Sequence, residues 1–273
     1  MRILRKGQSI SEEKLSVLKM AIRDYTLGHV GEEEIKSKLQ LYREAARKGL
    51  PSAEALLGHL YDKGIAVRRN LSKAIYWYKA SANHKYAHAQ SWLGFAYENG
   101  IGVRKSLRNA LFWYRRASRR GEASAQFNLG QIFAEGPTFI RSPSKAVRYW
   151  RKSALQGNYY AQCNLGKAYE TGVGVRANLL DAVKWYRKAA EQGDTVAYFN
   201  LGRCFAYGFG VRKNRRKAII WLNRSAKAGY RNANEELKII GACTPTIEQS
   251  AANGTECVSY LKGARRASWR SRP

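Results

Sequence analysis

The fold of this chain is decided by a stretch of 36 residues, YYAQCNLGKAYETGVGVRANLLDAVKWYRKAAEQGD, at positions 159–194. Apolar residues in its first half recur at intervals of three and four, which predicts an amphipathic helix from Tyr160 to Thr171. A Gly-Val-Gly run at 172–174 ends this helix, because glycine adopts the positive φ angles that helix ends require. Asn178 then caps a second helix that extends through Ala190. The stretch therefore predicts a pair of helices joined by a short loop.

The same pattern occurs five times along the chain, and each copy begins 36 residues after the one before it. The pair Leu-Gly marks the first helix of every copy, at residues 57–58, 93–94, 129–130, 165–166 and 201–202. The second helix is marked by an alanine at Ala74, Ala110, Ala146, Ala182 and Ala218, and by an aromatic residue at Trp77, Trp113, Tyr149, Trp185 and Trp221. Agreement at so many positions in one register identifies a tandem repeat of helix pairs.

A single copy is too small to fold alone. Ordering one copy costs on the order of 50 kcal/mol of conformational entropy, and one helix pair cannot bury enough apolar surface to offset that cost. Neighbouring copies must supply the rest of the core, so we expect an all-α solenoid of stacked helix pairs.

The pattern Ala-x-Ala-x-x-x-Leu-Gly-x-x-Tyr-x-x-Gly-x-Gly-Val, followed by Ala-x-x-Trp-Tyr-x-Lys-Ala-Ala-x-x-Gly, resembles the Sel-1-like repeat, a relative of the tetratricopeptide repeat. The resemblance covers about Pro51 to Tyr230, and the copy at 159–194 matches almost throughout. It implies a right-handed α/α superhelix of tetratricopeptide-like helix pairs. It also implies a non-catalytic scaffold or adaptor for protein–protein interactions, without naming the partner.

The extent of the pattern divides the chain. We expect a basic N-terminal arm at 1–10, a divergent capping repeat at 11–50, five Sel-1-like repeats at 51–230, a C-terminal capping helix at 231–241 and a disordered tail at 242–273. Within the capping repeat, Ser11 to Tyr25 is the expected first helix, and Leu41 to Gly49 aligns with the second helix of a copy.

The charge of the chain indicates an anionic partner. Forty-nine Lys and Arg residues against 20 Asp and Glu residues give a formal net charge of +29. Most of the excess lies between Lys63 and Asn234, within the repeats, so it belongs to a surface of fixed shape. We expect a protein partner that is acidic or offers an extended peptide. The alternative is contact with the backbone of a nucleic acid or with another anionic surface, without base stacking, because the repeat-spaced tryptophans are predicted to be core residues.

Three asparagines, Asn128, Asn164 and Asn200, precede Leu-Gly in successive copies. In tetratricopeptide proteins the matching asparagine faces the concave groove and can hold a peptide backbone or a terminal carboxylate, so the resemblance implies a peptide-binding ladder. Lys167 and Arg203 follow their asparagines by three residues and share their helix face, which adds them to a candidate site for an acidic peptide. The alternative is that these residues are ordinary solvent-facing polar side chains.

A second candidate set lies at the loops between the two helices of a pair. The family usually places Asp at the start of the second helix, where this chain has Asn70, Ser106, Ser142, Asn178 and Asn214. Four copies carry an arginine two residues earlier, at Arg68, Arg104, Arg176 and Arg212. Because a helix N-terminus offers free N–H groups and the positive end of the helix dipole, these arginines are candidates for binding a phosphate or carboxylate. The alternative is that they are solvated loop residues.

The sequence offers no catalytic constellation, so we predict no enzymatic activity, no cofactor and no metal site. His84 and His88 stand four residues apart without an evident third ligand. Cys163 and Cys204 align with apolar positions of other copies and are predicted to be small core residues. No segment reads as a signal peptide or a membrane span, which favours a cytoplasmic location, with leaderless export as an effector left open.

Overall fold

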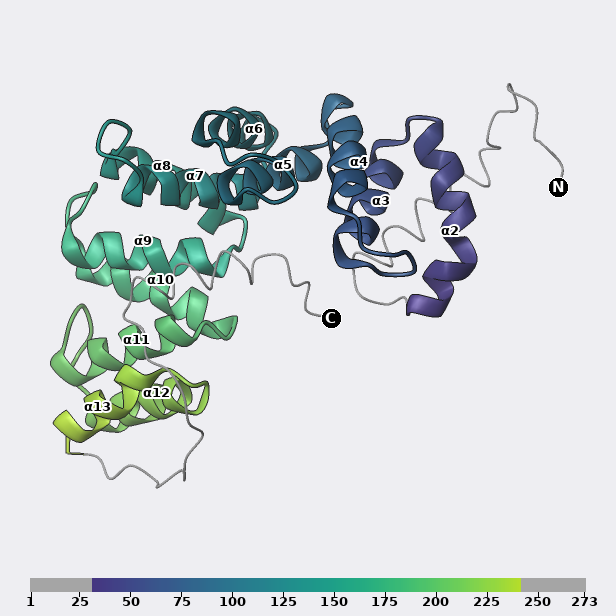
Figure 1. The fold of residues 1–273 in the computed structure, drawn as a ribbon. Coiled ribbons are helices and arrows are strands. Elements are labelled where there is room, and N and C mark those ends of the chain that lie inside the picture. The colour runs from purple at the N-terminus through teal and green to yellow at the C-terminus, as the bar shows by residue number, and fades with distance from the viewer. Residues whose placement is uncertain (1–30, 242–273) are drawn as a thin grey trace, which may run out of the picture. The chain divides into compact units, whose positions relative to one another are not determined.

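A computed structural model describes residues 31–241, and all the regular structure of this part is helical (Figure 1). The first helices of the five copies are α3 (Pro51–Lys63), α5 (Ala87–Asn99), α7 (Ala123–Glu135), α9 (Tyr159–Thr171) and α11 (Thr195–Tyr207). The second helices are α4 (Leu71–Asn83), α6 (Leu107–Arg119), α8 (Pro143–Leu155), α10 (Leu179–Glu191) and α12 (Arg215–Lys227). The flanking helices are α2 (Glu32–Arg47) and α13 (Arg231–Ile239). The helix expected at Ser11 to Tyr25, the basic arm and the C-terminal tail lie outside the described residues.

The helices form two compact units, α2 to α6 and α7 to α13. Within each unit every helix packs on the next one in sequence, and the two helices of one copy, such as α9 and α10, pack most extensively. Successive copies are joined by contacts such as those between α8 and α9. The prediction of an all-α solenoid built from helix pairs is confirmed.

The Leu-Gly glycine allows the two helices of a copy to approach closely. A methyl group at Gly166 would lie 2.7 Å from the ring of Tyr186 on the facing helix, and the same contact recurs between Gly94 and Tyr114. The aromatic residues that fill this space therefore lie one position after those expected. The tryptophans at the expected spacing, such as Trp185, are half-buried at the edge of the core.

The predicted caps of the second helices are confirmed in four copies. Side-chain oxygens of Asn70, Ser106, Asn178 and Asn214 each accept a hydrogen bond from the backbone N–H three residues further on. Ser142 makes no such bond, and its hydroxyl lies 3.4 Å from that of Ser144. The caps satisfy N–H groups that have no partner within the helix.

Polar side chains link the two helices of a copy. The Ser153 hydroxyl donates to the carbonyl of Ala123 over 2.8 Å, across 30 positions of the chain. Three positions further on, Gln156 Nε2 donates to Gln126 Oε1 over 2.8 Å, and Gln192 repeats this bond with Gln162. These bonds join the end of the second helix to the start of the first helix of the same copy.

Candidate functional site

A cavity of about 510 Å³ lies in the α7–α13 unit. Most of its wall is apolar or aromatic, contributed by Phe127, Trp150, Tyr160, Val196, Phe199 and Tyr230. Asn164 and Lys167 reach it from α9, and Asn200 and Arg203 reach it from α11. A concave apolar site with a few converging polar groups is the usual form of a binding pocket.

Four of the five predicted peptide-binding residues therefore meet in one cavity, because they occupy the same two positions of adjacent copies. The fifth, Asn128, is 5% exposed on α7 and does not line the cavity. Of the three asparagines in the predicted peptide-binding set, two therefore line this cavity, Asn164 and Asn200.

Each asparagine of the cavity also contacts the preceding copy. Asn164 Nδ2 donates to Gln131 Oε1 over 2.7 Å. Asn200 Nδ2 lies 3.9 Å from Cys163 Sγ, a much weaker contact. Because sulfur is a poor acceptor, the Asn200 amide keeps more of its capacity for a ligand than the Asn164 amide does.

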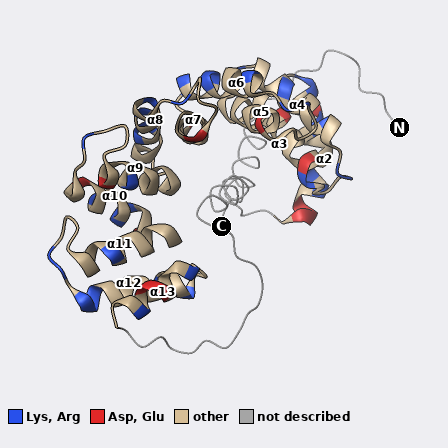
Figure 2. Ribbon diagram, turned by 60° about the vertical axis from the view of Figure 1, so that its left-hand side comes forward, with Lys and Arg blue, Asp and Glu red and all other residues tan. Residues whose placement is uncertain are grey.

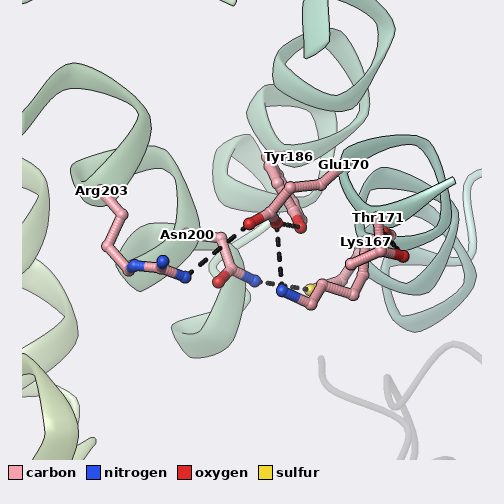
Figure 3. A network of polar contacts seen from close by, with 7 residues as sticks. Lys167, Glu170, Thr171, Tyr186, Asn200 and Arg203 are labelled. Atoms are coloured by element: carbon pink, nitrogen blue, oxygen red, sulfur yellow. Dashed lines mark hydrogen bonds and ion pairs between the residues drawn. The ribbon is translucent and has the colours of Figure 1, made fainter. Parts of the chain in front are cut away.

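The two cations of the cavity share a carboxylate, as Figure 3 shows. Glu170 Oε2 lies 3.3 Å from Lys167 Nζ, and Glu170 Oε1 lies 3.8 Å from Arg203 Nη1. The Tyr186 hydroxyl donates to Glu170 Oε2 over 2.5 Å, so the carboxylate is held from the core side as well. The Glu170 side chain is 14% exposed, whereas that of Lys167 is 52% exposed. The cations are thus partly neutralised from within the fold.

Burial determines the protonation of the groups beneath the cavity. It raises the pKa of Tyr186, and the nearby carboxylate of Glu170 raises it further, so this residue remains a neutral donor. Burial, and secondly Glu170, raises the pKa of Cys204 to about 12, which keeps it a thiol. Burial also raises the pKa of Asp194 to about 6, against the opposing effect of its hydrogen bond from the Ala197 N–H.

Sequence reasoning missed Glu170, although the repeat contains a signal for it. Copies with Tyr at the core position of the second helix (Tyr78, Tyr114, Tyr186) carry an acid 16 residues earlier, at Asp62, Glu98 and Glu170. The copies with Trp150 and Leu222 carry alanine there. Tyr114 donates to Glu98 over 2.9 Å in the same way. In the second and fourth copies the acid is therefore the acceptor of a buried phenol, and in the fourth copy it also pairs with two cations.

The four predicted loop-edge arginines, Arg68, Arg104, Arg176 and Arg212, are exposed, and none of them lines the 510 Å³ cavity. Arg68 lines a shallow cavity of about 490 Å³ with Arg43, Arg69 and Lys73. In the second-helix N-termini of these four copies, the capping side chain already occupies one of the free N–H groups. Their role in anion binding stays a prediction.

Other chemical signals in the described part of the chain are structural. His84 Nδ1 lies 2.8 Å from Glu54 Oε2, which ties the end of α4 to α3, the first helix of the same pair. Cys163 and Cys204 are buried thiols, as predicted. Between residues 31 and 241, His, Cys, Asp and Glu form no group of three suited to a metal ion. The helices of this part also include none long and apolar enough to cross a membrane.

The stacked helix pairs and the cavity on them define a helical-repeat protein of the binding type. The family model of the Sel1 repeat matches residues 51–86, 87–122, 123–158, 160–194 and 195–230, and the chain belongs to this family. Sel1 repeat proteins are generally scaffolds for protein–protein interactions.

Solved structures show the same fold. A Sel1 repeat protein from Oxalobacter formigenes is 27% identical, with a TM-score of 0.72 over 90% of this chain and 100% of that one. A protective antigen of uropathogenic Escherichia coli strains is 26% identical, with a TM-score of 0.71 over 96% of this chain and 56% of that protein. An immunity protein from Pseudomonas aeruginosa shares the fold at 18% identity, with a TM-score of 0.53 over 89% of this chain and 92% of that one. None of the curated proteins compared with the chain matches it.

Proposed function

We propose that this protein is a non-catalytic scaffold whose α7–α13 unit binds an extended, acidic segment of a partner protein in the 510 Å³ cavity. One observation carries the proposal: two cations and two asparagines converge beside an apolar wall. An extended peptide presents side chains and backbone amides together, and this wall offers complementary surfaces for both.

The cations supply the preference for acid. Lys167 is half-exposed, and its pairing with Glu170 leaves two ammonium N–H groups for another acceptor. Arg203 lies 3.8 Å from Glu170, longer than a good charge-assisted hydrogen bond, so its guanidinium can form a closer bond with an incoming carboxylate. A charge-assisted bond of this kind contributes about 1.5–3 kcal/mol.

The aromatic wall supplies the remaining affinity. Phe199 and Tyr230 lie with ring centroids 5.0 Å apart, and Phe127 and Tyr160 with centroids 5.8 Å apart. An apolar side chain packed against these rings gains on the order of 2 kcal/mol from burial. The partner segment we propose therefore carries an apolar anchor next to an Asp, a Glu or a terminal carboxylate.

The protonation of the buried groups favours binding over catalysis. The Cys204 thiol and the Tyr186 phenol both remain protonated at neutral pH, so neither is an activated nucleophile or base. The proposal includes the cytoplasmic location, which cell fractionation with an antibody against the native chain tests.

Selection from a displayed library of random peptides tests the proposal. We expect enriched peptides to combine an apolar residue with an acidic residue or an acidic C-terminus. Arg203→Gln and Asn200→Ala should each lower their affinity about tenfold, which corresponds to about 1.4 kcal/mol. Arg216→Gln is the matched control, because it removes one exposed charge outside the cavity. Selected peptides without acids, or equal affinity for the Arg203→Gln variant, contradict the proposal.

A second candidate, binding to nucleic acid or another anionic surface, is favoured by the cations of the second helices, several of which are visible in Figure 2. Arg116 lies 4.6 Å from the ring centre of Phe112, Lys188 4.6 Å from that of Trp185, and Arg224 4.6 Å from that of Trp221. These half-exposed rings hold the cations at the surface. Titration of a labelled oligonucleotide at two salt concentrations tests this candidate, since phosphate contacts weaken steeply with salt.

A further inference from the structure

The glutamine hydrogen bond that joins the two helices of a copy is missing from the copy at 87–122, in the α2–α6 unit. Gln90 corresponds to Gln126 and Gln162, and its Nε2 donates to the carbonyl of Ala82 over 3.0 Å. Gln90 is 1% exposed, and within the described residues its Oε1 has no hydrogen-bond partner. In the third and fourth copies the donor to the equivalent oxygen is Gln156 or Gln192. Arg120 stands at this position in the copy at 87–122. Arg120 instead places Nη1 3.5 Å from the carbonyl of Arg116.

A second departure from the repeat lies beside the first. The loops before α3, α7, α9, α11 and α13 each contain a glycine with φ between 81° and 91°. These glycines are Gly49, Gly121, Gly157, Gly193 and Gly229. The loop before α5 has Lys85 at this position, with a φ of 64°. Residues with a side chain rarely adopt this conformation. The backbone is therefore strained at Lys85, where the other loops have glycine.

Both departures face one small cavity of about 300 Å³ at the ends of α4 and α6. It is lined by Lys85, Arg116, Arg119, Arg120, Gln90, Ala82 and Asn83. No ion pair of the four cations occurs among the described residues. The nearby acid Glu122 lies 4.0 Å from His88 Nδ1 instead. Four like charges in one cavity repel each other unless an anion joins them.

We propose that this cavity binds a phosphate group. Guanidinium groups suit the oxygens of phosphate because each can donate two hydrogen bonds in parallel. The Lys85 ammonium adds a further cationic donor to those of the arginines. The side-chain carbonyl oxygen of Gln90 lacks a hydrogen-bond donor. The site should therefore prefer an anionic ligand that can also donate a hydrogen bond. Hydrogen phosphate carries an O–H group, and a phosphorylated side chain brings the N–H groups of its peptide. Sulfate has neither at neutral pH.

The site is independent of the peptide cavity, because all its residues belong to the other unit. It also differs from the loop-edge arginines in having an unpartnered buried acceptor. The phosphate can come from free inorganic phosphate or from a phosphorylated residue of a partner, and the two sources present the same anionic group to Lys85 and Arg120.

Calorimetric titration of the full-length protein tests this site with inorganic phosphate, sulfate and a phosphoserine peptide at pH 7 and low ionic strength. The double variant Lys85→Gly/Arg120→Gln installs the residues found in the third and fourth copies, so the fold accommodates it. Lys152→Gln/Arg216→Gln removes the same charge at exposed positions outside the cavity and serves as the matched control. Gln90→Leu removes the unpartnered acceptor.

We expect phosphate to bind at least about tenfold more tightly than sulfate, and Lys85→Gly/Arg120→Gln to lower phosphate affinity about tenfold or more, while the control stays within about twofold. Gln90→Leu should remove the preference for phosphate over sulfate. A phosphoserine peptide that binds more tightly than phosphate assigns the site to a phosphorylated partner, and the reverse assigns it to the free ion. Equal phosphate binding by wild type and the double variant, or no binding of either ligand by wild type, overturns the proposal.

Discussion

At Gly166 a hydrogen atom is all that separates α9 from the ring of Tyr186. A methyl group there would lie 2.7 Å from the ring and 3.2 Å from the Ala182 carbonyl, so the helices must move apart. We expect Gly166→Ala to lower the free energy of unfolding by about 1–3 kcal/mol. Urea denaturation measures this. Gly31→Ala is the control, because no atom lies within 4 Å of the added methyl group, and an equal loss there would contradict the packing explanation.

Asp194 makes stability depend on pH. Its pKa is raised from 3.8 to about 6 by burial, so between these values the folded state holds a proton that the unfolded state has released. Stability from this group is complete below about pH 4 and is lost as pH rises to about 6, by up to about 3 kcal/mol.

Asp194→Asn keeps the helix cap but does not titrate. We therefore expect the variant to gain stability relative to wild type as pH rises from about 4 to about 6.5, in urea denaturation at several pH values. A difference that stays constant over this range would show that Asp194 titrates normally.

At the scale of the helix, the second helices depend on their caps to different degrees. Asn178 Oδ1 accepts a hydrogen bond from the Asp181 N–H over 3.1 Å, whereas Ser142 makes no capping bond. We expect Asn178→Ala to cost about 1 kcal/mol of unfolding free energy and Ser142→Ala to cost less than about 0.5 kcal/mol. Thermal denaturation of both variants measures the difference. Equal losses would mean that the observed capping bonds do not stabilise these helices.

The bounds of the helices could be predicted from the sequence because their signals are local. The spacing of apolar residues placed α9 and α10 within one residue at each end, because periodicity and caps are local. Ser142 stands at the N-cap position of its helix as in the other copies, but its side chain makes no capping bond, and the sequence alone did not distinguish it from the other caps.

At the scale of the whole molecule, the formal charge of +29 works against folding, because like charges are brought together in the compact state. We expect the melting temperature to rise by at least about 2 °C between 20 and 300 mM sodium chloride, as salt screens this repulsion. Scanning calorimetry checks this, with an uncharged solute at the same osmolarity as the control. A melting temperature that falls with salt would show that attractive ion pairs outweigh repulsion.

The sequence by itself determined the class of fold, the family and the Leu-Gly and alanine positions of the core, because a helix pair repeated in phase can bury its apolar faces only against neighbouring copies. It also indicated Asn164, Lys167, Asn200 and Arg203 as one set, since equivalent positions of adjacent copies lie side by side.

Only the tertiary structure decided how these residues are paired. That Glu170 joins Lys167 to Arg203, and that Gln90 Oε1 is buried without a partner, depends on side chains from different helices meeting in space. A repeat period places residues on a helix face, but hydrogen bonds and ion pairs require distances of a few ångströms, which packing between copies determines.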